Sequence, residues 1–311
     1  MHLAYVRSNT PASWKPTLSV GVANMSVMIL VTGGSGTVGS ALLETLCAAG
    51  HPVRAAYHAQ RDVDRAAAAG RDAVRIDLGE PATLPSALQD VEAVFLVGAM
   101  GRDQTRQELN LIEAATVAGI PRVVKLSVWR ADEELTPIAR LHRPAELALQ
   151  ASGLGYTFLQ PNFYMQNFTR QFVASIKMTG QFAQPRADAP ISFVDVRDIA
   201  RVAARVLTTD GHEGRVYALT GPEALTYDAA AEVLSRVLDR PVRFVGLSDA
   251  DARTAMLGRG LPAYYADALI EVSRAYRDGG AETITTTVCD LTGREPTTFE
   301  QFVRDHRAAF T

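Results

Sequence analysis

Apolar runs alternate with helical patterns along the first half of the chain. Val27–Val31 holds five consecutive apolar residues, which is typical of a strand buried on both faces of a parallel sheet. Further runs predict strands at Pro52–Tyr57, Ala73–Ile76, Val91–Val97 and Arg122–Ser127. Between them, helical spacing occurs at Thr37–Ala49, Pro81–Gln89 and Thr105–Ala118. Strands that alternate with helices in this way predict a doubly wound parallel α/β sheet.

The second half of the chain predicts the rest of the sheet and then a smaller, mostly helical lobe. Short strands are expected at Tyr156–Gln160, Ile191–Val194 and Val216–Leu219. Helical spacing occurs at Leu141–Ala151, Val196–Leu207, Tyr227–Leu238, Ala250–Leu257, Tyr264–Tyr276 and Phe299–Phe310. The last helix follows Thr297-Thr298-Phe299-Glu300, which has the form of a capping box. Residues 162–175 are rich in aromatic side chains, which fits a packed core and a pocket wall equally well.

A glycine-rich turn joins the first predicted strand to the first predicted helix. Gly33, Gly36 and Gly39 follow the spacing G-x-x-G-x-x-G. The first glycine allows the tight turn, the second lets the backbone approach a pyrophosphate, and the third lets the helix pack closely on its strand. The N–H groups of the helix N-terminus would then face the phosphates. A plain tight turn is the alternative, but the flanking strands and helix favour a dinucleotide site of the Rossmann type.

The end of the second predicted strand bears on which dinucleotide is bound. A Rossmann site that prefers NAD places a carboxylate there for the ribose 2′-hydroxyl, whereas an NADP site places cations there. This chain has His58 and Arg61, and its first acid is Asp62. These residues favour NADP(H) over NAD(H); the alternative is that both are solvated loop residues. Gly98 ends the fourth strand and flanks the point where the strand order reverses, so it is expected beside the cofactor.

Composition and charge exclude several other classes of protein. The chain has 311 residues, of which 21% are charged, as expected for a globular protein that can bury a sizeable core. Its formal net charge of −3 and its lack of a basic stripe argue against a nucleic-acid groove. No apolar run approaches the roughly 18 residues of a membrane span, so the cytoplasm is the expected location. Residues 1–25 lack the pattern of a signal peptide and are expected to form a disordered extension.

The two cysteines, Cys47 and Cys289, give no sign of a disulfide framework or a metal site. They lie far apart in the sequence, and no C-x-x-C motif occurs. No metal is therefore expected.

Six stretches spread over nearly the whole chain follow one family pattern. They are Ile29–Gly39, Ala114–Ser127, Ser152–Pro161, Ile191–Ala200, Gly214–Gly221 and Leu291–Phe299. From Met28 to its end, the chain resembles the NmrA-like family of atypical short-chain dehydrogenases/reductases, and within it the NAD(P)H quinone oxidoreductase and azoreductase branch. That family contains reductases as well as proteins that only sense the cofactor.

The resemblance implies cofactor contacts at the glycine loop and after the second, third, fourth and sixth strands. The residues at these places are Thr32, Gly33, Ser35, Gly36, Thr37, Val38, Gly39, His58, Arg61, Asp77, Leu78, Gly98, Pro161, Asn162 and Phe163. The chain departs from the family pattern twice, because relatives usually have Arg where His58 stands and many have Arg where Gln160 stands. A neutral imidazole holds a 2′-phosphate less firmly than a guanidinium does.

The residue pair of ordinary short-chain dehydrogenases is missing. Those enzymes use Tyr-x-x-x-Lys, in which the Lys lowers the pKa of the Tyr that donates a proton. No Tyr of this chain has a Lys four residues later, and alignment through Glu146 puts His142 at the Lys position and Ile138 at the Tyr position. His142 and Glu146 share one helix face, as a proton donor oriented by a carboxylate or as a surface hydrogen bond.

A serine adds a second candidate for the active site. Ser127 ends the fifth strand, where the family's active-site serine would lie. Lys125 shares its face of the strand, either as part of the site or as a snorkelling side chain. His142 and Ser127 are therefore the candidate catalytic residues.

These features predict a reductase that moves hydride from NAD(P)H directly to an electron-poor small molecule. A quinone is the preferred acceptor, because its developing oxyanion is delocalised and needs little acid catalysis; azo and enone compounds are alternatives. Only one dinucleotide motif is visible, so no flavin is expected. The competing interpretations are a non-catalytic NADP(H)-binding redox sensor and a relative of nucleotide-sugar epimerases, which the missing Tyr and Lys disfavour.

The expected organisation has two parts. Residues 26–160 and 195–220 form the NAD(P)-binding Rossmann domain, and residues 161–194 and 221–311 form a substrate-binding lobe over the carboxyl edge of the sheet. The expected partners are a small-molecule substrate and, as a candidate assembly, a second copy in a homodimer. Neither a nucleic acid nor a membrane is expected to bind.

Overall fold

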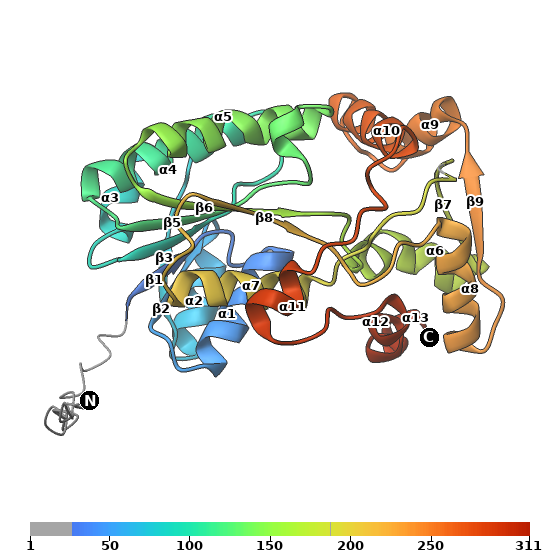
Figure 1. The fold of residues 1–311 in the computed structure, drawn as a ribbon, viewed down its shortest axis with the longest axis horizontal. Helices are drawn as coiled ribbons and strands as arrows, with labels where there is room; N and C mark the ends of the chain where they lie inside the picture. The colour runs from blue at the N-terminus through green and yellow to red at the C-terminus, as the bar shows by residue number, and fades with distance from the viewer. Residues whose placement is uncertain (1–26, 187) are drawn as a thin grey trace, which may run out of the picture.

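The computed structural model describes residues 27–186 and 188–311, and a seven-stranded parallel sheet lies at its centre (Figure 1). The strands are β1 (Ile29–Val31), β2 (Val53–Tyr57), β3 (Asp72–Arg75), β4 (Ala93–Leu96), β5 (Arg122–Leu126), β6 (Gly155–Pro161) and β8 (Arg215–Leu219). Their order across the sheet is β3-β2-β1-β4-β5-β6-β8, and every pairing is parallel. The predicted doubly wound α/β sheet is therefore confirmed. The predicted extension 1–25 lies outside the described residues.

Helices cover both faces of this sheet. Those below it in Figure 1 are α1 (Thr37–Ala48), α2 (Gln60–Ala68) and α7 (Val196–Thr208), and those above it are α3 (Leu84–Ala87), α4 (Gln104–Ala118) and α5 (Pro137–Ala151). Ile29 and Val31 of β1 pack into the core with α1 and α7, whereas Leu30 packs into the opposite core. Because side chains alternate along a strand, both layers require apolar residues from β1. This explains why the sequence of β1 is an unbroken run of apolar residues.

The lobe lies at the right of Figure 1 and combines helices with a small second sheet. Its helices are α6 (Val173–Thr179), α8 (Tyr227–Leu238), α9 (Asp249–Gly258), α10 (Ala263–Arg277), α12 (Phe299–Asp305) and α13 (Arg307–Phe310). Two parallel strands, β7 (Gln181–Pro185) and β9 (Arg243–Leu247), form the second sheet, which the sequence pattern did not indicate. Phe168 packs edge-on against the ring of Phe299, with centroids 4.7 Å apart, inside the lobe's core. Part of the aromatic segment 162–175 is therefore core.

Two local predictions are wrong. Among the described residues, Ile191–Val194 forms isolated bridges, to Leu225 and Tyr164, in place of the predicted strand. The last predicted helix, Phe299–Phe310, begins at Phe299 as predicted, but it is split at His306 into two helices. Thr298 caps it by accepting from the N–H of Gln301 at 3.1 Å, while the N–H of Thr297 is held by Asp198.

One segment between lobe helices returns to the large sheet. Helix α11 (Thr287–Thr292) packs against α7, and its Val288 is buried in the same core as α1 and α7. The chain then re-enters the lobe, where Phe299 and Phe302 are buried. The lobe and the sheet are thus joined by several crossings of the chain.

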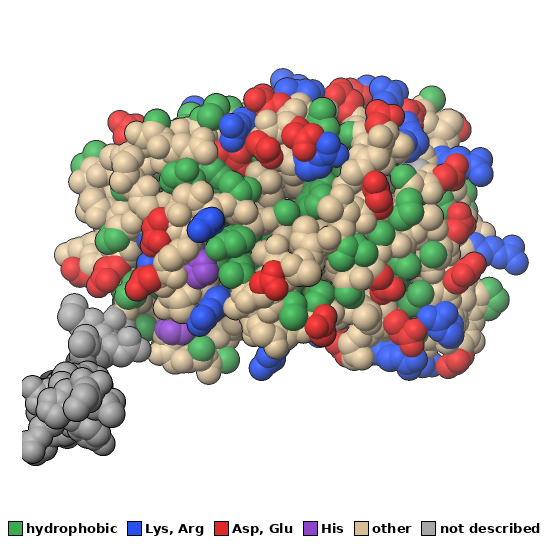
Figure 2. Space-filling model, in the orientation of Figure 1, with side chains coloured by type: hydrophobic (Ala, Val, Ile, Leu, Met, Phe, Trp, Pro, Cys, Tyr) green, Lys and Arg blue, Asp and Glu red, His purple; other side chains and the backbone are tan. Residues whose placement is uncertain are grey.

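The surface mixes charges of both signs. On the face drawn in Figure 2, blue and red side chains are interspersed, with small apolar patches between them. Within residues 27–186 and 188–311, no helix has both the length and the apolar character needed to cross a membrane.

Candidate active site

The glycine loop forms an open cradle at the carboxyl end of β1. Gly33 has φ +61°, which favours glycine, and its carbonyl accepts from the N–H of Gly36 at 2.8 Å. A Cβ on Gly39 would lie 2.2 Å from the Gly33 oxygen, so the first turn of α1 packs on the loop only because Gly39 has no side chain. A Cβ on Gly36 would approach only that same oxygen, at 3.1 Å, so the outer side of Gly36 is open toward a ligand.

The start of α1 is suited to an anion. Its N-cap residue is Gly36, which has no side chain to cap the helix, and no acidic residue lies in the first turn. The first N–H groups of a helix have no partner within the helix, and they carry the positive end of its dipole. The open side of Gly36 and the uncapped start of α1 are the features expected of a phosphate site, and the site itself stays a prediction.

Thr32 holds the loop rather than pointing into the cradle. Its hydroxyl lies 2.9 Å from the carbonyl of Val97 and accepts from the N–H of the same residue at 2.8 Å. The side chain is buried, with 1% exposed. Thr32 thereby fixes the end of β1 to the end of β4 at the point where the strand order reverses, and it positions Gly98 beside the loop.

The predicted contacts at the ends of β2 and β3 lie together. His58 is exposed, and its Nε2 lies 3.2 Å from the Asp77 carboxylate. The same carboxylate accepts from the N–H of Gly79 at 2.8 Å, which orders the turn after β3. Arg75 places its guanidinium 3.3 Å from the His58 carbonyl, and Arg61 is exposed at the start of α2. Three side chains that can carry positive charge, together with the Asp77 carboxylate, therefore lie at or just after the ends of β2 and β3 or in the first turn of α2.

A buried ion pair lies beneath Gly98. Lys125 of β5 and Glu108 of α4 are both fully buried, with Nζ 2.7 Å from Oε2. The other oxygen of Glu108 accepts from the N–H of Gly98 at 3.3 Å. Lys125 also donates to Nδ1 of His142 at 3.1 Å. The pair thus connects the end of β4 with the helix that carries His142.

His142 is held as a neutral imidazole. Burial, and then the positive charge of Lys125, keep the pKa of His142 well below its usual range. Since Nδ1 accepts from Lys125, the ring proton lies on Nε2, which is 3.0 Å from the side-chain amide of Gln104. The Gln104 oxygen lacks a partner among the described residues, and turning this amide over would let it accept that proton but would break the bond from the amide nitrogen to Glu108 Oε1 at 3.3 Å.

Glu146 orients Ser127 and not His142. The hydroxyl of Ser127 donates to Oε1 of Glu146 at 2.6 Å, and the amide of Gln160 donates to the same oxygen at 3.0 Å. Arg143 donates to the other oxygen at 3.0 Å. Within the described part of the chain, no hydrogen bond joins His142 to Glu146, so the expected pair is not formed. His142 faces α4, whereas Glu146, one turn later, faces the ends of β5 and β6.

Asn162 joins the end of β6 to the lobe. Its amide nitrogen donates to the Ser192 hydroxyl and to the Ala281 carbonyl, both at 2.9 Å. Its oxygen accepts from the N–H of Phe163 at 2.8 Å and from the Tyr276 hydroxyl at 2.9 Å. These bonds occupy the Asn162 side chain within the protein, so its part in the site is to place the turn after β6.

Comparison with known proteins identifies the family. A model of the NmrA-like family matches residues 25–303. The chain belongs to the NmrA-like family. It is 37% identical over 284 residues to the NAD(P)H azoreductase of Xenophilus azovorans, covering 91% of this chain and 99% of the relative. It is 32% identical over 279 residues to quinone oxidoreductase 2 of Escherichia coli, covering 89% and 97%.

A third relative and one solved structure extend the comparison. The (4-alkanoyl-5-oxo-2,5-dihydrofuran-3-yl)methyl phosphate reductase of Streptomyces griseus is 38% identical over 287 residues, covering 91% of this chain and 99% of the relative. The crystal structure of the Escherichia coli NADPH-dependent quinone oxidoreductase QOR2 complexed with NADPH has a TM-score of 0.82 and 30% identity, covering 90% of this chain and all of that one. The resemblance and the fold expected from the sequence are thus confirmed.

Several site residues of this NmrA-like chain were not singled out from the sequence. Glu108 and Gln104 could have been recognised as buried polar residues, because they lie at helical spacing on the same face of α4 as Ile112 and Ala115. Arg170 could not be recognised from the sequence pattern, because it lies in the lobe and its guanidinium donates to the hydroxyl of Thr37 in the distant glycine loop.

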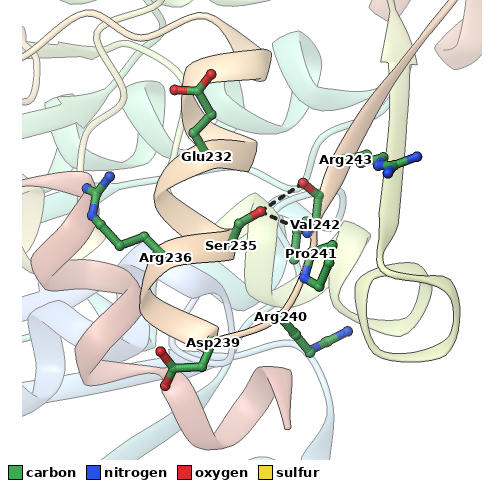
Figure 3. A pocket seen from close by; sticks show the side chains of 8 residues that line it. All are labelled: Glu232, Ser235, Arg236, Asp239, Arg240, Pro241, Val242 and Arg243. Atoms are coloured by element: carbon green, nitrogen blue, oxygen red, sulfur yellow. Dashed lines mark hydrogen bonds between the residues drawn. The ribbon is translucent and has the colours of Figure 1, made fainter.

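Two surface cavities lie away from these residues. The one in Figure 3 has about 660 Å³, and it opens between the end of α8 and the start of β9. There Ser235 bonds the backbone of Val242, and Arg236 and Arg240 are engaged by Glu300 and by backbone carbonyls. The other has about 420 Å³ and lies between Arg130 and α10. Neither cavity is lined by a predicted site residue. In the described part of the chain, no cluster of His, Cys, Asp and Glu could hold a metal.

Proposed function

We propose that this chain is an NADP(H)-dependent reductase that transfers hydride directly to an electron-poor small molecule, with quinones as the preferred acceptors. Azo and enone compounds are the alternative acceptors. The relatives at 32–38% identity are named reductases and oxidoreductases, and each matches about nine-tenths of this chain. The observation that carries the proposal is the glycine cradle, which is open at Gly36 beside an uncapped helix end.

The residues present fit a nicotinamide dinucleotide. The backbone from Gly33 to Thr37 would hold its pyrophosphate, and the cluster around His58 and Arg61 would hold the 2′-phosphate. When bound, the cofactor supplies the hydride. Gly98 and Ser127 follow the ends of the neighbouring strands β4 and β5, which supports a role for both residues where the cofactor would meet its substrate.

The acid chemistry that the site offers is weak. Ile138 stands at the position of the usual tyrosine and has no proton to give. His142 is neutral and bonded to Lys125, and Ser127 is bonded to Glu146. Such a site suits an acceptor whose developing negative charge is delocalised, as in a quinone, because that charge needs no strong proton donor in the transition state.

The sensor interpretation receives less support from the relatives. The crystal structure of NmrA, a negative transcriptional regulator, in complex with NADP is 18% identical to this chain, so that likeness concerns the fold alone. We therefore prefer the reductase interpretation to the sensor interpretation. Our proposal also includes independence from flavin and metal, a homodimer and a cytoplasmic location, each of which stays a prediction.

An acceptor screen with purified protein tests the proposal. We expect NADPH oxidation with quinones, and slower oxidation with azo dyes or enones. Gly36→Val should abolish cofactor binding by filling the cradle, whereas Gly258→Val, at an open position at the end of α9, should not. Unchanged NADPH affinity in Gly36→Val would refute the proposal that the glycine cradle binds the cofactor. Tight binding without turnover on any acceptor would favour the sensor.

A further inference from the structure

Arg170 reaches from the lobe to the glycine loop. Its guanidinium donates to the hydroxyl of Thr37, the first residue of α1. Arg170 lies on a π-helical turn, Phe168–Phe172, and such turns are frequent at functional sites. Phe168 and Phe172 are both buried in the aromatic core of the lobe, which holds the backbone of this turn in place. The side chain of Arg170 is thus extended toward the loop from a fixed base.

The side chain of Arg170 is exposed to solvent. Within residues 27–186 and 188–311, no carboxylate pairs with it, and its hydrogen-bond partner is the neutral hydroxyl of Thr37. By contrast, Arg197 and Arg277 are each paired with acids. A guanidinium beside the positive end of a helix dipole is unfavourable unless an anion lies between them. Because Arg170 is exposed, solvent weakens this repulsion, but an anion at the start of α1 could contact the guanidinium and the helix N–H groups together.

We propose that Arg170 binds the pyrophosphate of the dinucleotide and thereby ties the lobe to the glycine loop. This inference rests on the proposed function. Thr37 is one residue from Gly36, where the cradle is open, so a pyrophosphate there lies within reach of the guanidinium. Arg, with its planar fork of donors, is well suited to phosphate oxygens.

The topology separates this contact from the 2′-phosphate. Arg170 follows β6, and β6 lies on the opposite side of β1 from β2. His58, at the end of β2, marks the 2′ position. Arg170 should therefore contribute equally to the binding of NADPH and NADH, which share the pyrophosphate and differ at the 2′ position.

Fluorescence titration of NADPH and NADH, with ADP-ribose as a competitor, tests this assignment. In Arg170→Ala we expect the Kd of all three to rise by a similar factor, roughly tenfold, as for a lost charged hydrogen bond. Arg170→Lys should recover part of the affinity, because it restores the charge without the fork. Lys177→Ala, which removes another exposed positive charge from the same lobe, should leave all three affinities unchanged.

The outcomes separate this inference from the proposed function. An equal loss for NADPH, NADH and ADP-ribose supports it. Unchanged affinities in Arg170→Ala, with normal binding by the wild type, overturn it and leave the reductase proposal intact. A loss confined to NADPH also overturns it, because the arginine would then hold the 2′-phosphate. Failure of the wild-type protein to bind any of the three would refute the proposed function itself.

Discussion

The buried pair of Lys125 and Glu108 should be a principal determinant of stability at the site. Replacing Lys125 with Met keeps an unbranched side chain, one heavy atom shorter, but leaves the Glu108 carboxylate fully buried without its 2.7 Å partner. Breaking a buried pair in this way typically costs about 3–5 kcal/mol, because one charge remains uncompensated. The free energy of unfolding of Lys125→Met should fall by about that amount at neutral pH.

A second substitution distinguishes the lost charge balance from lost packing. Glu108→Gln, added to Lys125→Met, removes the remaining charge while keeping an oxygen for the N–H of Gly98, so the double variant should recover about 2 kcal/mol or more. Lys177→Met, at an exposed site, is the matched control and should change stability by less than about 0.5 kcal/mol.

Urea unfolding followed by circular dichroism measures all four proteins. A loss below about 1 kcal/mol in Lys125→Met would refute this reasoning, since the pair would then contribute no more than an exposed one. Equal losses in the single and double variants would also refute it, because the damage would then arise from packing and not from charge.

Three further predictions concern cofactor choice, pH and turnover. Replacing His58 and Arg61 together with Ala should weaken NADPH binding by roughly 1–3 kcal/mol more than NADH binding; an unchanged affinity ratio in titrations would contradict it. The folded-state pKa of His142 lies below its unfolded value of 6.5, so stability is lost as the pH falls below about 6.5. The free energy of unfolding, measured across this pH range, should therefore depend less on pH in His142→Gln than in the wild type, by up to about 1.4 kcal/mol per pH unit. The same pH dependence in both proteins would contradict this prediction. His142→Ala should lower kcat by about tenfold or less on a quinone and by more on an azo or enone acceptor; equal, negligible losses on both would remove His142 from the mechanism.

The elements with a strong hydrophobic period could be predicted from the sequence. The unbroken apolar run was sufficient to predict β1, because a strand that is buried on both faces has apolar residues at every position. The helical spacing of apolar residues was sufficient to predict α8, because one face of that helix is buried. Strands β7 and β9 were not found, since neither alternates strictly between buried and exposed residues: Phe182 and Pro185 are the buried residues of β7, and none of the five residues of β9 is buried.

The partners of site residues were harder to predict than the site itself. Periodicity places His142 and Glu146 on one helix, but their partners come from other elements: Lys125 on β5 and Ser127 at its end. Nothing along the chain relates Arg170 to the glycine loop, because they meet only when the lobe packs beside the sheet.

Direct hydride transfer is tested by the amount of quinol formed per NADPH consumed, measured without air or added flavin. We expect equal amounts of quinol and oxidised cofactor with the wild-type protein, and neither with Gly36→Val. Tight NADPH binding without quinol formation, or quinol formation only after flavin is added, would contradict direct hydride transfer.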